Sequence, residues 1–168
     1  MAKLSSRAIR QAITLLGTYD EKVAQEVHDA EDKVDIYEDV LGSYLMKLSA
    51  RSMTETDSQE VTKLLYMIGD FERISDHAVN IVDSADEIKD KGLQFSDKAI
   101  QELSVMYGAI NEIIQLTEEA FISQDEKKAY IVEPLEQVVD DLKEQIRVRH
   151  IKRLQKEECT MEHGFVLS

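Results

Sequence analysis

The chain has 168 residues, with 34 acidic and 20 basic side chains and a formal net charge of -14. Hydrophobic residues make up 43% and charged residues 32%, with one Pro, six Gly and no Trp. This composition is typical of one soluble domain rich in helix formers, and it excludes collagen and low-complexity disorder. The negative charge also argues against nucleic-acid binding, because a phosphate backbone would be repelled.

Two further features concern the compartment in which the chain resides. No run of about 18 consecutive apolar residues occurs, and the N-terminus has no apolar signal core, so we expect no membrane-spanning segment. The lone Cys159 allows no internal disulfide and suits a reducing compartment, so we expect a cytoplasmic location. Apolar periodicity resumes in the closing MEHGFVLS, and we therefore expect a fragment, for which a membrane-attached parent protein stays open.

Apolar residues follow a helical period along two long segments of the chain. They recur at alternating steps of four and three residues, whereas a strand would need a period of two. We call each such row of apolar positions a seam. The first seam comprises Val23, Val27, Ala30, Val34, Tyr37, Leu41, Tyr44 and Leu48. The second seam comprises Val61, Leu64, Ile68, Phe71, Ser75, Ala78 and Val82.

Short connections between such long amphipathic helices predict antiparallel neighbours in an all-α bundle. Thr56 and Gln59 have the spacing of a capping box at the start of the third helix. Pro134, early in the fifth, should kink that helix or move its start to a later residue. The expected helices span about 4–16, 20–50, 57–90, 96–122 and 125–157, and a sixth begins near Met161.

The chain also repeats itself at an offset of 105 residues. Residues 20–35 align with residues 125–140 without a gap and share several identical residues, and both segments begin with the letters DEK. We therefore predict two tandem three-helix repeats within a single domain covering 1–168. The first repeat spans about 1–92, and the second spans about 93–168 and lacks most of its third helix.

Three pairs of acidic residues are spaced four apart, which places both members on one helical face. Each acid directly follows a residue at a seam position, at the edge of the bundle. Stacked carboxylates repel one another unless cations or protons compensate, and such oxygen ligands suit magnesium, manganese, calcium or iron. These candidate metal ligands are Glu31 and Asp35, Glu72 and Asp76, and Glu136 and Asp140.

A solvated acidic face explains any single pair, and only the recurrence of the pairs at matched positions favours metal binding. Ion pairing by Arg73 would also neutralise the acids, and His77 is expected beside a site or on the surface rather than as a ligand. No Glu-x-x-His element, phosphate loop or nucleophile elbow occurs. We therefore expect no enzymatic activity.

The stretch IGDFERISDHAVNI at 68–81 carries the string E-R-I-x-D-H-A-x-N-I. On this string the chain resembles the PhoU family, whose domains are duplicated three-helix bundles with Glu/Asp-x-x-x-Asp motifs. The resemblance covers essentially the whole chain. The closing stretch from Arg147 is similar to the PhoU-like domain attached to bacterial sodium/phosphate cotransporters, and a stand-alone phosphate-signalling PhoU is the less similar branch.

The resemblance implies a cytoplasmic regulatory domain of phosphate uptake. It also implies multinuclear metal clusters on the three acidic motifs, holding iron, manganese or magnesium, through which phosphate could bind. The partner would be the membrane transporter portion of the parent protein, with no nucleic acid involved. The alternatives are a purely structural helical scaffold and a stand-alone signalling protein without a bound metal.

The second E-R-x-x-D-H string of the family should lie just beyond Ser168. Its absence leaves the apolar faces around Leu142 and Ile146 without the helix that would cover them. Exposed apolar stripes of this size drive association. We therefore expect a homodimer or a borrowed helix.

Overall fold

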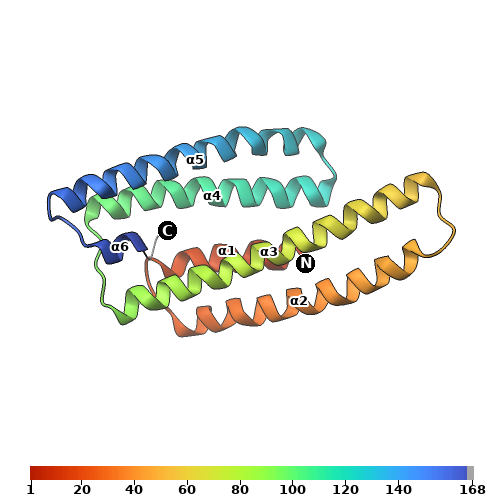
Figure 1. Ribbon diagram of the computed structural model, residues 1–168, viewed down its shortest axis with the longest axis horizontal. Coiled ribbons are helices and arrows are strands. Elements are labelled where there is room, and N and C mark those ends of the chain that lie inside the picture. Colours follow the sequence, from red (N-terminus) through yellow and green to blue (C-terminus); the bar gives the residue numbers. More distant parts are fainter. Residues whose placement is uncertain (166–168) are drawn as a thin grey trace. The chain divides into compact units, whose positions relative to one another are not determined.

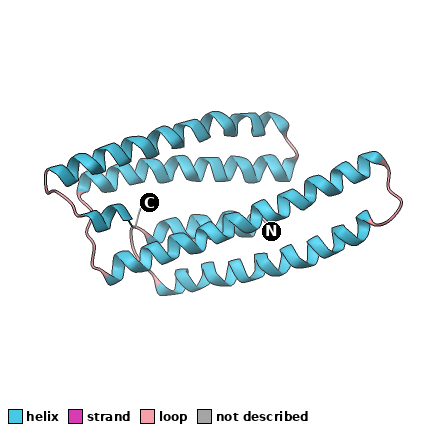
Figure 2. Ribbon diagram, in the orientation of Figure 1, coloured by secondary structure: helices cyan, strands magenta, loops and turns pink. Residues whose placement is uncertain are grey.

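The chain is almost wholly helical. The computed structural model describes residues 1–165, and within that range six helices and no strand occur (Figure 1, Figure 2). The predicted all-α fold is confirmed, and the expected bounds of the first five helices agree with the observed ones to within two residues. In chain order the helices are α1 (Ala2–Leu15), α2 (Glu21–Ser49), α3 (Glu55–Asp90), α4 (Asp97–Ser123), α5 (Glu126–Gln155) and α6 (Met161–Phe165).

The chain divides into two compact units. The first unit covers Met1–Asp83 and contains α1, α2 and most of α3. The second unit begins at Ser84, in the last turns of α3, and contains α4, α5 and α6. The division therefore falls inside a continuous helix, nine residues before the boundary expected between the two repeats.

In the first unit α1 packs against α2, and α2 and α3 form an antiparallel hairpin closed by residues 50–54 (Figure 1). Small side chains let the helices approach, and Ser75 of α3 is fully buried among them. Its hydroxyl donates a 2.7 Å hydrogen bond to the carbonyl oxygen of Glu72, so burial leaves no unpaired polar group. The buried apolar residues of this unit include Ala8, Ile9, Ala12, Ile13, Val27, Ala30, Val34, Phe71, Ala78 and Val82.

The apolar seam predicted along α2 holds only as far as Val34. Beyond that residue Tyr37 is 49% exposed and Tyr44 is 62% exposed, while Leu45 is buried instead. A straight helix drifts by about 20° per heptad from a strict seven-residue repeat, which rotates the later seam positions away from the core. In addition, α1 has 14 residues and α2 has 29, about 21 Å and 44 Å, so α1 covers at most half of α2.

Aspartates cap the two helices that the internal repeat makes equivalent. Asp20 accepts a hydrogen bond from the backbone N–H of Lys22 at 2.8 Å, at the start of α2. Asp125 accepts one from the backbone N–H of Lys127 at 3.0 Å, at the start of α5. The two caps are 105 residues apart, as the predicted duplication requires.

The capping box of α3 begins two residues before the predicted one. Thr54 Oγ1 accepts the N–H of Asp57 at 3.2 Å, and Asp57 Oδ2 accepts the N–H of Thr54 at 3.3 Å. The prediction of Thr56 with Gln59 was therefore wrong. Both pairs have the required spacing, but Asp57 brings a negative charge to the positive end of the helix dipole.

In the second unit α4 and α5 form an antiparallel pair joined by ion pairs (Figure 1). Lys128 Nζ lies 2.6 Å from Glu119 Oε2, and Arg153 Nη1 lies 2.9 Å from Glu102 Oε2. The side chains of the second pair are only 11% and 13% exposed. No residue of α5 is buried, in contrast to α2, whose first half packs against α1 and contains four of its five buried residues.

Pro134 lies inside α5, which begins at Glu126. The expectation of a later helix start was therefore wrong. Proline has no N–H to donate, so the carbonyl of Tyr130 loses its helical hydrogen bond. The Asp125 cap, which accepts from two backbone N–H groups, stabilises the turn before this interruption.

Candidate metal centre

The α2–α3 hairpin brings two of the predicted acidic pairs together. On α2, Glu31 and Asp35 directly follow the buried residues Ala30 and Val34. On α3, Glu72 and Asp76 directly follow Phe71 and Ser75 in the same way. Because the helices are antiparallel, an i,i+4 pair on one helix faces an i,i+4 pair on the other. The first acid of each pair then lies opposite the second acid of the facing pair.

Three of these carboxylates form a compact group. Glu31, Asp35 and Asp76 each offer an oxygen atom, and these oxygens all lie within 4.8 Å of one another. Glu31 is half-buried and Asp35 is exposed, so the group lies at the edge of the bundle, as predicted. Oxygens bonded to one hard cation at about 2.0–2.5 Å are at most about 4–5 Å apart, so this spacing fits a shared ion.

The electrostatics of Glu31 show the cost of this arrangement. Burial raises the pKa of the Glu31 carboxyl above 4.5, and the negative charges of Asp35, Asp32 and Asp76 raise it further. Only His28 opposes the shift. The site therefore favours protons or cations over bare carboxylates.

Glu72 belongs to the same electrostatic cluster. Burial raises the pKa of its carboxyl most, followed by the charge of Asp76 and a side-chain hydrogen bond with Asp76. Glu38 and Asp35 across the hairpin add to the shift. A carboxyl that shares a hydrogen bond with a second carboxyl holds a proton, which a cation can replace.

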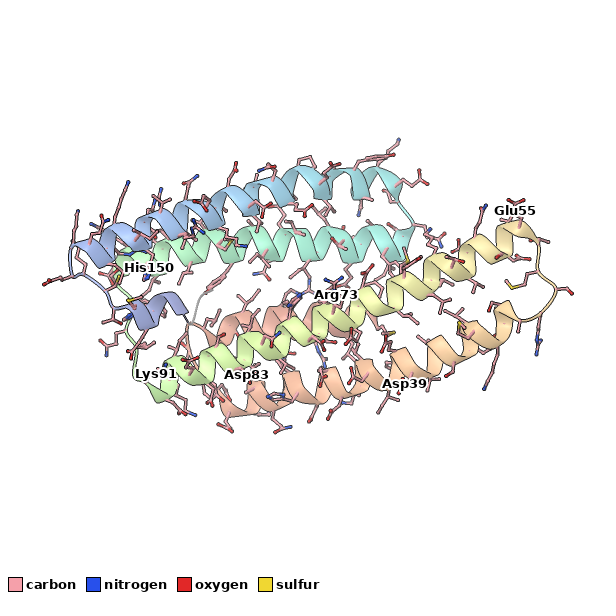
Figure 3. The ribbon with its side chains drawn as sticks, viewed as in Figure 1. Asp39, Glu55, Arg73, Asp83, Lys91 and His150 are labelled. Carbon is pink, nitrogen blue, oxygen red and sulfur yellow. The ribbon has the colours of Figure 1, made fainter. Side chains whose placement is uncertain are left out.

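The two residues expected beside the ligands, Arg73 and His77, are exposed on α3. The Arg73 Nη1 atom is 4.0 Å from Asp70 Oδ1, and both side chains are largely exposed (Figure 3). The histidine whose charge acts on the cluster is His28, three residues before Glu31 on α2.

Glu136 and Asp140, the repeat equivalents of Glu31 and Asp35, are both exposed on α5. Within residues 1–165 the structure assembles no second group of three possible metal ligands around them. In the first unit the third ligand comes from α3. Of the equivalent helix in the second unit, the described chain contains only the five residues of α6. These two predicted ligands therefore remain a prediction.

The sequence interpretation overlooked Glu38, Asp32 and His28. Glu38 follows Asp35 by three residues and Glu31 by seven, so it lies on the same face of α2. That spacing alone would have revealed it. The influence of Asp32 and His28 depends on the directions of their side chains, which the spacing of acids does not give.

Comparison with known proteins identifies the family of the chain. The model of the PhoU domain matches residues 1–85, slightly more than half of the chain. The chain belongs to the PhoU family. This match includes the whole E-R-I-x-D-H-A-x-N-I string and all four acids that converge in the first unit.

A PhoU relative matches almost the full length of the chain. The "Phosphate-specific transport system accessory protein PhoU homolog 1" of Thermotoga maritima is 23% identical over 167 residues. The alignment covers 99% of this chain and 71% of that protein, and so extends through the second unit. No solved structure matches the chain.

Proposed function

We propose that this PhoU domain is a non-enzymatic regulator of phosphate uptake that binds metal ions at Glu31, Asp35 and Asp76. The observation that carries the proposal is the 4.8 Å grouping of three carboxylate oxygens contributed by two helices. Glu72 and Glu38 add two more carboxyl groups to this cluster, and a cation can displace the proton that such a cluster retains. The donors are all hard oxygens, which fits iron, manganese or magnesium better than a thiolate-binding metal.

The same site supports a role in recognising phosphate. A bound cation would cancel the repulsion between α2 and α3 and offer coordination positions to phosphate. Without such compensation an anion would be repelled by a chain of net charge -14. We therefore propose that the acids hold the positive charge and that phosphate, or a carboxylate of a partner, is the ligand of the regulated state.

The partner in this proposal is a phosphate transporter at the cytoplasmic face of the membrane. The name of the Thermotoga relative supports an accessory protein of a phosphate-specific transport system. This fits at least as well as the attachment to a sodium/phosphate cotransporter expected from the closing sequence. None of the helices within residues 1–165 combines the length and apolar character needed to cross a bilayer.

The metal content of protein purified without chelator tests the proposal directly. We expect stoichiometric iron, manganese or magnesium, and a melting temperature that falls in EDTA and rises on addition of the metal, because a ligand that binds only the folded state stabilises it. The double variant Glu31→Gln with Asp76→Asn should lose the metal and the EDTA sensitivity.

The matched control removes the same number of charges from the same helices. Asp39→Asn with Asp83→Asn alters exposed acids of α2 and α3 outside the three-carboxylate group (Figure 3). This variant should keep the metal. Absence of metal from the wild-type protein, with no shift in melting, would support the scaffold alternative and contradict the proposal. Phosphate binding that is unchanged after thorough chelation would contradict the phosphate role alone.

A further inference from the structure

The C-terminal half of α5 differs in charge from the rest of the chain. Residues 142–156 contain six basic side chains and one acidic side chain, in a chain of net charge -14. Arg149 and Arg153 are used inside the second unit, because both pair with Glu102 of α4 at 3.4 Å and 2.9 Å. The other four basic residues are exposed along the helix; they are Lys143, Arg147, Lys152 and Lys156.

These four residues form two rows on the exposed side of α5. Lys143 and Arg147 are four residues apart in one row, and Lys152 and Lys156 are four apart in the other. Between the rows lie Val148 and Ile151, which are 39% and 45% exposed. We name the basic-apolar face after these six residues: Lys143, Arg147, Val148, Ile151, Lys152 and Lys156.

Glu144 lies within the same arc of the helix but does not cancel its charge. Its Oε2 atom is 3.5 Å from the Nε atom of Arg147, and both side chains are more than half exposed. The pair is therefore a weak surface ion pair. The face retains three lysines for which the described structure shows no ion pair.

The apolar centre of this face is not a surface left for the missing helix of the repeat. The positions equivalent to Val148 and Ile151 in the first unit are Ser43 and Met46, 105 residues earlier. Both are exposed on α2, although α2 has its third helix beside it. A complete repeat therefore leaves these positions uncovered.

We propose that the basic-apolar face binds the surface of an anionic lipid bilayer. An apolar strip flanked by Lys and Arg is the pattern of helices that lie in the membrane interface, where apolar side chains enter the headgroup region and cations contact lipid phosphates. A nucleic acid would use the charges but not the exposed Val and Ile. Acids border the face on both sides, with Asp140 and Asp141 before it and Glu157 and Glu158 after it, so its net positive charge is modest and its attraction to an anionic surface should weaken as salt screens the charges.

This inference is independent of the metal site, and its test is done in EDTA. The full chain is mixed with vesicles of equal parts phosphatidylglycerol and phosphatidylcholine, or of phosphatidylcholine alone, and bound protein is measured by flotation. We expect binding to the anionic vesicles only, weakening as salt is raised. Equal binding to both kinds of vesicle, or binding to neither, would overturn the proposal.

The charge requirement is tested by a quadruple variant in which Lys143, Arg147, Lys152 and Lys156 become Gln. Each basic residue near an anionic surface contributes about fivefold to partitioning, so binding should fall below detection. Glutamine keeps the helix propensity, and circular dichroism verifies the fold.

The matched control changes four exposed lysines of the first unit to Gln and should bind vesicles as the wild type does. These residues are Lys22, Lys33, Lys47 and Lys63. Equal loss in both variants would contradict a local site.

The apolar requirement separates lipid from other polyanions. Val148→Ser with Ile151→Ser should weaken vesicle binding by at least tenfold, because about 0.8 kcal/mol is lost for each CH₂ withdrawn from the bilayer. The control Ile100→Ser with Val105→Ser removes an Ile and a Val of α4 that are more exposed than Val148 and Ile151, and it should have no effect. Tighter binding to a DNA duplex than to vesicles, unaffected by the Val148 and Ile151 changes, would assign the face to nucleic acid instead.

Discussion

At the scale of single residues, the acidic cluster makes stability depend on pH in an uncommon direction. Burial and the neighbouring charges of Asp35, Asp32 and Asp76 raise the pKa of Glu31 above 4.5 in the folded chain. Above that value the folded state therefore holds more protons than the unfolded state. Stability must then fall as pH rises through the window above 4.5, because deprotonation occurs at a lower pH in the unfolded chain. The contribution of Glu31 is most favourable at acid pH.

Glu31→Gln should therefore stabilise the metal-free chain at neutral pH. Like-charge pairs spaced i,i+4 cost about 0.2–0.5 kcal/mol, so a gain of a few tenths of a kcal/mol is expected, and it should vanish near pH 4.5. Urea unfolding followed by circular dichroism in EDTA, at several pH values, measures the difference between variant and wild type. Other titrations, such as that of Glu119, whose pKa is lowered by Lys128, are common to both proteins and cancel.

Glu136→Gln is the control, because Glu136 is the repeat equivalent of Glu31 and lies exposed on α5, outside the three-carboxylate group. Its effect on stability should be smaller and less dependent on pH. If Glu31→Gln destabilised the chain at neutral pH in EDTA, the carboxylate would be making a favourable contact, and the view of the cluster as a repulsive site awaiting a cation would be wrong.

At the scale of elements, Pro134 is an unusual feature of the second unit. It lies nine residues into α5, where it removes one helical hydrogen bond and its ring crowds the carbonyl of Tyr130. Proline in a helix interior costs about 3 kcal/mol relative to alanine. Pro134→Ala should therefore raise the free energy of unfolding by about 1–3 kcal/mol, the lower value applying if the local backbone has already relaxed.

The repeat supplies the opposite experiment in α2. Asp29 occupies the position equivalent to Pro134, is exposed, and accepts a hydrogen bond from Gln25. Asp29→Pro should destabilise the first unit by about 3 kcal/mol. Thermal and urea unfolding measure both variants. A loss of stability in Pro134→Ala would show that the proline favours the native course of α5.

The elements also show which parts of the fold could be predicted from sequence. Helix bounds followed from the helical period of the apolar residues and from the short connections between segments. The one cap predicted from sequence, Thr56 with Gln59, was wrong, because Thr54 and Asp57 have the same spacing and form the box instead. The outward rotation of Tyr37 and Tyr44 did not follow. This rotation depends on how much of α2 the short α1 covers and on the drift of α2 relative to its neighbours. The apolar pattern of one segment contains neither.

The candidate site, too, could be predicted from the sequence only in part. The spacing of Glu31 with Asp35, and of Glu72 with Asp76, showed which acids share a face. Their convergence required the register of the hairpin, which is set by the loop at 50–54. Arg73 lies three residues from both Asp70 and Asp76 in sequence, and its ion pair is with Asp70, because rotamers decide between partners at i-3 and i+3.

At the scale of the whole molecule, the charges and the exposed apolar residues are unevenly distributed. The first unit carries the convergent acids, and α5 in the second unit carries a basic stretch. A stripe of large apolar side chains lies on α2 beyond the part that α1 can cover. In this stripe Ile36, Val40 and Tyr44 follow one another at intervals of four residues and are each about 60% exposed.

A stripe of this kind should drive self-association, because monomers rarely leave contiguous apolar patches open to water. We expect sedimentation velocity to show a dimer, with the same stripe of each chain contributing to an isologous contact. Val40→Ser with Tyr44→Ser should shift the chain toward monomer. The control Ile100→Ser with Tyr130→Ser removes exposed apolar side chains of α4 and α5 and should leave the dimer intact. A wild-type monomer at micromolar concentration would contradict this prediction. A dimer sensitive only to the control changes would also contradict it, by placing the contact in the second unit.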